Sequence, residues 1–261
     1  WAALAVALIG AGLFGGLIAG LFGVGGGTVM VPALFYAFEL LGVGGESNLH
    51  VAIGSSLLTI VATSWRSLGA HRAHGAVDET VLRTWTPWVA FGALIGAGIA
   101  GMTSMANLGW VYGVCLILVA AQMALTPDGW KLAGDLPTGW GRRVIAATIG
   151  GLSAMMGIGG GSLGGMTMTL FGRPIHQAVA TASGFGFAIG LAATLGFVLF
   201  GWGAPGRPPL SLGYVNVPAA ITLGLLTTAV APFGARLATV LRRAFAVYLT
   251  LAAVAVLIKA L

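Results

Sequence analysis

The chain has 261 residues, of which 58% are hydrophobic and only 7% are charged, and its mean hydropathy is +0.99. Soluble domains carry charged side chains at roughly a quarter of their positions, so this composition excludes a water-soluble protein and predicts a multi-pass protein of the cell (inner) membrane, with the lipid bilayer as its surroundings. The net charge of +6 comes from basic residues in short loops between apolar runs, which is typical of topology signals, and nucleic acid is not an expected partner.

Ten apolar runs predict ten helical segments. In chain order they cover 2–22, 28–42, 49–69, 84–103, 106–125, 143–157, 162–172, 176–201, 214–232 and 243–261. The longest polar stretch, 126–141, is rich in Pro, Gly and charged residues and is typical of a linker. We therefore expect an all-α fold in which a first half over 1–125 is joined by this linker to a second half over 142–261.

Three sequence blocks occur once in each half, in the same order. The matching pairs are 16–28 with 150–162, 50–56 with 176–182, and 75–78 with 213–216. The first pair shares a triple glycine followed by a hydroxyl residue, Thr28 or Ser162, and the second pair opens on His50 or His176. An internal duplication explains this order, so each half would hold about five helical segments.

Each triple glycine separates two apolar runs, one of which is short. As a helix, 162–172 would span about 16 Å, against about 30 Å for the hydrocarbon core of a bilayer, and Arg173 and Pro174 end it. Each pair of runs could therefore form a re-entrant hairpin, two spans, or one span broken at the glycines. The apolar pattern alone does not choose between them.

The basic residues argue against one broken span in each half. A hairpin or a pair of spans returns the chain to its starting side, and most basic residues then fall on one side of the membrane, with only Arg207 and Lys259 on the other. The larger group comprises Arg66, Arg72, Arg83, Lys131, Arg142, Arg143, Arg173, Arg236, Arg242 and Arg243. A single broken span would mix the two sides. The favoured topology has an odd number of segments in each half, which predicts an inverted repeat.

The interrupted backbone at the triple glycines is the strongest candidate for a binding site. Irregular backbone within a bilayer is tolerated only where protein covers it or where it lines a cavity. Thr28 and Ser162 are suitable N-cap residues, so each following helix would direct free N–H groups and a positive dipole end into the protein, which suits an anion. The alternative is close packing through small residues, which we expect for Gly92 and Gly96.

Side chains near the glycines complete the candidate site for a small anionic substrate. His50 and His176 could line a pathway or only cap helices, and Arg173 could bind an anion or only mark the basic side of the membrane. The candidate substrate-binding residues are Gly25, Gly26, Gly27, Thr28, His50, Ser55, Ser56, Gly159, Gly160, Gly161, Ser162, Arg173, His176 and Thr181.

Several other functions are disfavoured by what the sequence contains. The six acidic residues lie at segment ends or in loops, which argues against a cation pump. Gly-Lys-Ser and Gly-Lys-Thr are absent, so ATP hydrolysis is not expected. The single cysteine, Cys115, cannot form a thiolate cluster within one chain, and we expect no metal, no cofactor and no catalytic residue.

The doubled Gly-x-Gly-Gly-Gly, each followed by a His-x-Ala-x-x-Ser/Thr block, resembles the sulfite exporter TauE/SafE permease family over essentially the whole chain. The resemblance implies an inner-membrane permease that moves sulfite or organosulfonates such as sulfoacetate outward. Gln177 and Ala182 depart from the first block, so we expect the two half-sites to differ. We predict a secondary transporter of small anions, with a passive anion channel or a membrane-embedded enzyme as alternatives. The anion, the coupling ion, the direction of transport and any homo-oligomeric state are left open.

Overall fold

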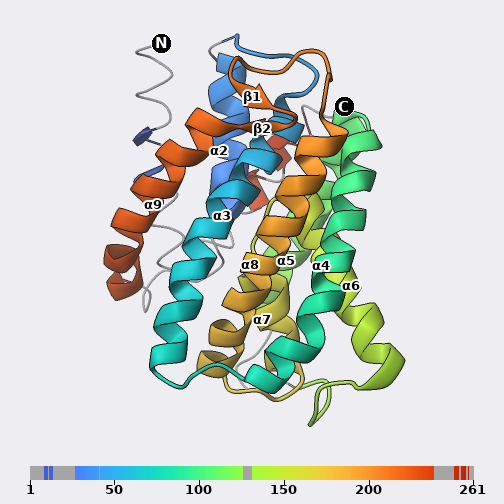
Figure 1. The fold of residues 1–261 in the computed structure, drawn as a ribbon, viewed down its shortest axis with the longest axis vertical. Helices are drawn as coiled ribbons and strands as arrows, with labels where there is room; N and C mark the ends of the chain where they lie inside the picture. The colour runs from blue at the N-terminus through green and yellow to red at the C-terminus, as the bar shows by residue number, and fades with distance from the viewer. Residues whose placement is uncertain are drawn as a thin grey trace.

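The computed structural model describes residues 9–10, 12–13, 27–40, 42–125, 131–237, 250–252, 254–256 and 258. This part of the chain is a bundle of helices with one two-residue antiparallel strand pair (Figure 1). The elements are α2 (Gly27–Leu40), α3 (Asn48–Ala73), α4 (Glu79–Met102), α5 (Met105–Leu125), α6 (Gly139–Met156), α7 (Gly160–Leu170), α8 (Ile175–Phe200), β1 (Ser211–Leu212), β2 (Val215–Asn216) and α9 (Val217–Leu237). The predicted all-α fold of a polytopic membrane protein is confirmed.

Each predicted segment between 28 and 232 corresponds to a helix, but several helices are longer than their apolar runs. Helix α3 continues to Ala73, α4 begins at Glu79 and α6 begins at Gly139. The extra turns are polar. Arg72 in the added turn of α3 pairs with Glu79 in the added turn of α4 at 2.7 Å. Most of the predicted segments 2–22 and 243–261 lies outside the described residues.

The outer surface of the bundle is apolar, as a bilayer requires. Among the described residues, α3, α4 and α8 are long and apolar enough to cross a membrane, and α2, α5 and α9 contain shorter apolar helical stretches. Large hydrophobic side chains are exposed at helical spacing on α4 and α8; they include Phe91, Ile95, Ile99, Leu191, Leu195 and Leu199. Such stripes would be unfavourable in water, and in a membrane they contact lipid.

Contacts between connecting segments define the two ends of the bundle. At one end, which we call the strand end, Ser47 Oγ donates to the Pro205 carbonyl at 2.7 Å, beside β1 and β2. At the other end, the Leu132 amide donates to the Leu170 carbonyl at 2.7 Å, and Arg173 Nη2 lies 3.9 Å from Asp78 Oδ2. We call this second end the basic end.

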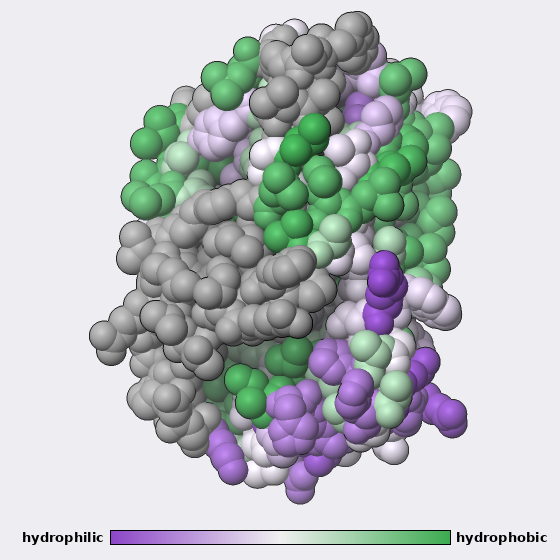
Figure 2. Space-filling model, turned by 90° about the vertical axis from the view of Figure 1, so that its left-hand side faces the viewer, coloured by the Kyte–Doolittle hydropathy of each residue, from purple (hydrophilic) through white to green (hydrophobic). Residues whose placement is uncertain are grey.

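Basic side chains gather at the basic end. Those on its helix ends and loops are Arg66, Arg72, Arg83, Lys131, Arg142, Arg143 and Arg173. Arg207 instead lies at the strand end, where its Nε donates to the Ala204 carbonyl at 2.6 Å. On the face drawn in Figure 2, hydrophilic side chains collect at the lower end below a mainly hydrophobic upper part. Arg242, Arg243 and Lys259 lie outside the described residues.

Helices α6 and α7 form a hairpin rather than one interrupted span. Gly157 ends α6 in a left-handed conformation (φ 63°), and its amide donates to the Ala154 carbonyl at 3.2 Å. The chain then reverses, because Leu170 at the end of α7 bonds to Leu132, shortly before α6 begins. Helix α7 has 11 residues, about 16 Å. A single broken span is therefore excluded in this half, and the hairpin enters the bundle from the basic end.

Close packing accounts for the glycines of α4. A Cβ on Gly92 would overlap the Ala147 carbonyl oxygen of α6, and one on Gly96 would overlap that of Gly151. Gly150 of α6 makes the reverse contact with the Val89 carbonyl. The predicted packing role of Gly92 and Gly96 is confirmed, and the two backbones approach as small-residue interfaces in membranes allow.

Candidate functional site

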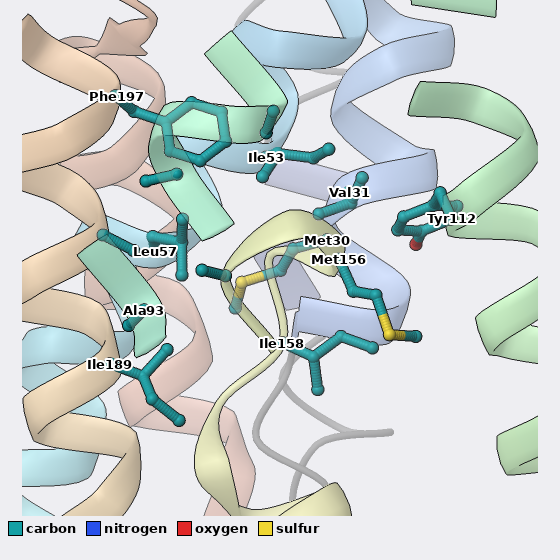
Figure 3. Close-up of a cluster of buried hydrophobic side chains, with 14 of the residues drawn as sticks. Met30, Val31, Ile53, Leu57, Ala93, Tyr112, Met156, Ile158, Ile189 and Phe197 are labelled. Atoms are coloured by element: carbon teal, nitrogen blue, oxygen red, sulfur yellow. The ribbon is translucent and has the colours of Figure 1, made fainter. Parts of the chain in front are cut away.

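The glycine motifs of the two halves meet inside the bundle. A Cβ on Gly27, where α2 begins, would overlap the Gly157 carbonyl oxygen and lie 3.0 Å from Ile158 Cα. Residues 156–160 are all buried. In Figure 3 the turn between α6 and α7, with Met156 and Ile158, enters beside Met30 and Val31 of α2 and below Ile53 of α3. Gly27 is thus a point of backbone contact between the halves.

Helix α3 of the first half holds this turn of the second half. Ser56 Oγ donates to the buried Gly157 carbonyl at 2.9 Å. A Cβ on Gly157 would lie 2.7 Å from Val31 Cγ2 and 3.2 Å from Ile53 Cα. The left-handed conformation and these contacts both favour glycine at this position. Ser56, a predicted site residue, therefore has a defined structural partner.

Helix α7 begins earlier than expected. Its N-cap is Gly159, which has no side chain with which to cap, and Ser162 lies within the first turn, where its Oγ donates back to the Gly159 carbonyl at 3.3 Å. The prediction that Ser162 is the N-cap was wrong, because the helix incorporates the glycines that precede it. Thr28 likewise lies inside α2, one residue after Gly27, and is buried.

The first amides of α7 remain outside the helical hydrogen-bond ladder, as at any helix start. Gly160 packs on α8, where its Cβ would lie 2.6 Å from Phe185 Cβ and 2.7 Å from the Gly186 amide nitrogen. Close packing therefore explains glycine at position 160. The amide groups at this helix start, and not the missing side chains, are what could bind an anion.

Ser64 of α3 lies beside this helix start and was missed from the sequence. The position of a Cβ on Gly186 is 2.5 Å from Ser64 Oγ and 3.4 Å from the Gly160 amide nitrogen. Helices α3, α7 and α8 thus bring a hydroxyl and an amide to the same glycine. The repeat gives no signal for Ser64, because Gly190 is its counterpart. The only hint is the hydroxyl-rich sequence of α3.

Ser55 and Thr181, at matching positions of the repeats, make matching contacts. Ser55 Oγ accepts from the Asn216 amide at 2.8 Å, and Thr181 Oγ1 accepts from the Asp78 amide at 2.9 Å. Asn216 and Asp78 are also matched, and each side chain accepts a hydrogen bond from the amide three residues later, at the start of α9 or α4. Each half therefore supplies a hydroxyl to a helix start of the other half.

The two predicted histidines lie at opposite ends of the bundle. His50 is 4% exposed, and its Nε2 lies 2.9 Å from the Thr103 carbonyl oxygen and 3.1 Å from that of Ala100. Since both partners are acceptors, Nε2 carries the proton. His176 is exposed at the start of α8. The structure does not bring these side chains together.

Arg173 also lies away from the glycine contact, at the basic end beside Asp78. The predicted site residues thus divide into a central group, which includes Gly27, Ser56, Gly160 and Ser162, and residues nearer the bundle ends. Gly25 and Gly26 lie outside the described residues. A role in substrate binding stays a prediction for all of these residues.

Comparison with known proteins identifies the family. The sequence profile of the sulfite exporter TauE/SafE family matches residues 8–258. The chain is 28% identical over 258 residues to a probable membrane transporter protein of Haemophilus influenzae, covering 95% of this chain and 96% of the relative. It is 25% identical over 220 residues to one of Methanocaldococcus jannaschii, covering 84% and 80%.

A further relative is the probable membrane transporter protein YunE of Bacillus subtilis, 29% identical over 213 residues, with 74% of this chain and 77% of the relative covered. No solved structure matches at a significant level. The family and the relatives' names point to a membrane transporter rather than an enzyme. With the family profile matching almost the full length of a chain whose helices are apolar enough to span a bilayer, this protein belongs to the sulfite exporter TauE/SafE family.

Proposed function

We propose that the protein is a secondary transporter that exports small sulfur-containing anions, such as sulfite or organosulfonates, across the inner membrane. The observation that carries the proposal is the contact of Gly27 with the Gly157–Ile158 turn. This contact places the starts of α2 and α7 inside the protein. Helices that begin at matching positions of two repeats are a recurrent feature of transporter sites.

The start of α7 has the chemistry that an oxyanion needs. Its free amides and dipole favour negative charge, and Ser162 and Ser64 add hydroxyl groups nearby. Within the described part of the chain, the acidic residues Glu39, Glu46, Asp78, Glu79 and Asp135 lie at helix ends or in connections. An anion at the α7 start would therefore not face a neighbouring carboxylate.

The arrangement of the halves supports alternating access. The α6–α7 hairpin enters from the basic end, whereas α2 runs from the bundle interior to the strand end. The reciprocal contacts of Ser55 and Thr181 are those that two inverted halves would make across a shared axis. In the proposed cycle the halves rock about this contact and expose the α7 start to one side at a time.

Sulfite flux in proteoliposomes tests the proposal. The full chain should move sulfite faster than empty vesicles do, and Ser64→Ala and Ser162→Ala should raise the KM by about tenfold, the effect of losing about 1.4 kcal/mol of binding. Ser67→Ala is the control, because it changes a serine of α3 that lies about one turn nearer the basic end than Ser64.

Three results would contradict the proposal. If sulfite and organosulfonates are not moved by correctly folded protein, the substrate assignment is wrong. A flux that does not change when a proton or ion gradient is imposed indicates a passive channel. Chemical conversion of the sulfite or organosulfonate, found by mass spectrometry of the vesicle contents, indicates an enzyme.

A further inference from the structure

Arg143 occupies an unusual position on the outer surface of the basic end. Its guanidinium carbon lies 5.0 Å from the ring centroid of Trp88 on α4 and 5.2 Å from that of Trp140 on α6. Trp140 is 75% exposed. Cations placed over aromatic rings at this distance are attracted to them, so the two tryptophans hold the guanidinium in place at the surface.

No carboxylate among the described residues lies within 4.0 Å of this guanidinium. Among the described residues the ion pairs within 4.0 Å are Arg72–Glu79 and Arg173–Asp78. Neither Arg142 nor Arg143 takes part in them, and the buried Nε of each has no acceptor in the described structure. Arg142 and Arg143, on consecutive residues of α6, thus have no carboxylate partner in the described part of the chain. Their Nη groups, and not the buried Nε atoms, are the ones that can bind an external anion. A guanidinium recognises a phosphate through paired N–H groups.

An exposed apolar surface continues from the arginines along the bundle. Phe91 is 55% exposed and makes an edge-to-face contact with Trp88, with centroids 6.3 Å apart. Beyond it on α4 lie the exposed Leu94, Ile95 and Ile99. Helices α4 and α6 pack backbone against backbone at Gly92 and Gly150, which sets the arginines of α6 beside the apolar side chains of α4. A ligand with an anionic head and a long apolar tail matches both parts.

We propose that Arg142, Arg143, Trp88 and Trp140 form a binding site for the headgroup of an anionic phospholipid, with an acyl chain lying along α4. Basic pockets between membrane helices bind such headgroups, and tryptophan favours the headgroup region of a bilayer. Charge complementarity selects the anionic lipid over a zwitterionic one. The site lies on the lipid-facing surface, separate from the glycine contact inside the bundle.

Native mass spectrometry of the full chain in detergent tests the site with phosphatidylglycerol and with phosphatidylcholine of the same acyl chains. The wild type should retain phosphatidylglycerol in preference. Arg143→Ala should weaken phosphatidylglycerol retention by about tenfold and leave phosphatidylcholine unchanged. Trp140→Ala, at an exposed position, should weaken it less. Arg66→Ala is the control, since Arg66 is an exposed arginine toward the same end without an aromatic partner among the described residues.

Several outcomes would overturn the proposal. One is equal retention of the two lipids, and another is a loss of phosphatidylglycerol in Arg66→Ala as large as in Arg143→Ala. Displacement of the lipid by millimolar inorganic phosphate would show that the arginines bind a free anion instead. Melting curves of each variant in the same detergent confirm that a lost lipid does not reflect unfolding.

Discussion

The imidazole of His50 stacks on the ring of Tyr214, with centroids 4.8 Å apart and the planes inclined by 28°. Tyr214 belongs to the second half, and in the aligned repeats its counterpart is Ala76. His176, the counterpart of His50, therefore has no matching ring available, and it is exposed. Two histidines that match in sequence thus have different surroundings because their partners in the other half differ.

The environment of His50 predicts a structural effect of its replacement. His50→Phe preserves a ring against Tyr214 but removes the donor to the Ala100 and Thr103 carbonyls, and we expect it to lower the free energy of unfolding by about 1–3 kcal/mol. His176→Ala, at an exposed position, should change it by less than about 0.5 kcal/mol. Thermal unfolding in detergent measures both. Equal destabilisation by the two changes would contradict the different surroundings described.

The hydroxyls of Ser55 and Thr181 are predicted to stabilise the association of the halves. Ser55→Ala and Thr181→Val each leave an amide without its acceptor, Asn216 in one case and Asp78 in the other, at a cost of about 1–3 kcal/mol. The control is Thr63→Val, because among the described residues the Thr63 hydroxyl bonds to carbonyls of its own helix alone. Melting temperatures that fall as far in the control as in the two variants would disprove this role.

The contact at Gly27 predicts that even one methyl group is harmful there. Gly27→Ala would place a Cβ against the Gly157 carbonyl, and overpacking of this kind costs about 1–3 kcal/mol. Gly69→Ala is the matched control, since nothing lies within 4 Å of its Cβ position. That change should stabilise α3 by up to about 1 kcal/mol. The two changes should shift the melting temperature in opposite directions. An unchanged melting temperature in Gly27→Ala would contradict the close contact between the backbones at Gly27 and Gly157.

The hydrogen bond from Ser56 predicts local ordering of the α6–α7 turn. Ser56→Ala removes the donor to the Gly157 carbonyl, so the turn should open more often and the amides of residues 157–161 should exchange with solvent about tenfold faster. Hydrogen exchange followed by mass spectrometry measures the effect. Ser67→Ala serves again as the control. Unchanged exchange in Ser56→Ala would show that packing alone fixes the turn.

The sequence predicted the helices well because apolar runs and helix breakers are local properties. Two differences show where local information ends. The polar turns at Glu79 and Gly139 extend helices beyond their apolar runs, and α7 begins at Gly160 despite the low helix propensity of glycine. In the second case the contacts of Gly160 with Phe185 and Gly186 favour a helical start that no local pattern indicates.

The candidate site was only partly predictable for a related reason. The repeat identified the motifs around Gly27 and Gly157. It did not predict that one packs on the other, because a single sequence gives no signal for a contact between residues 130 positions apart. Ser64 was missed because its repeat counterpart is a glycine. Ser55 and Thr181 were named as substrate residues. Their contacts with Asn216 and Asp78 depend on how the halves associate.

The exchange of hydroxyls between halves has a consequence for biosynthesis. The Asp78 amide gains its hydrogen-bond acceptor only after Thr181, 103 residues later in the chain, has been synthesised. The Ser55 hydroxyl likewise accepts from the amide of Asn216, which is synthesised 161 residues later. A newly inserted first half therefore lacks the hydroxyl that accepts from the Asp78 amide in the complete protein. Both contacts can therefore form only after the helices of both halves have been inserted, so the packing of the halves follows their insertion.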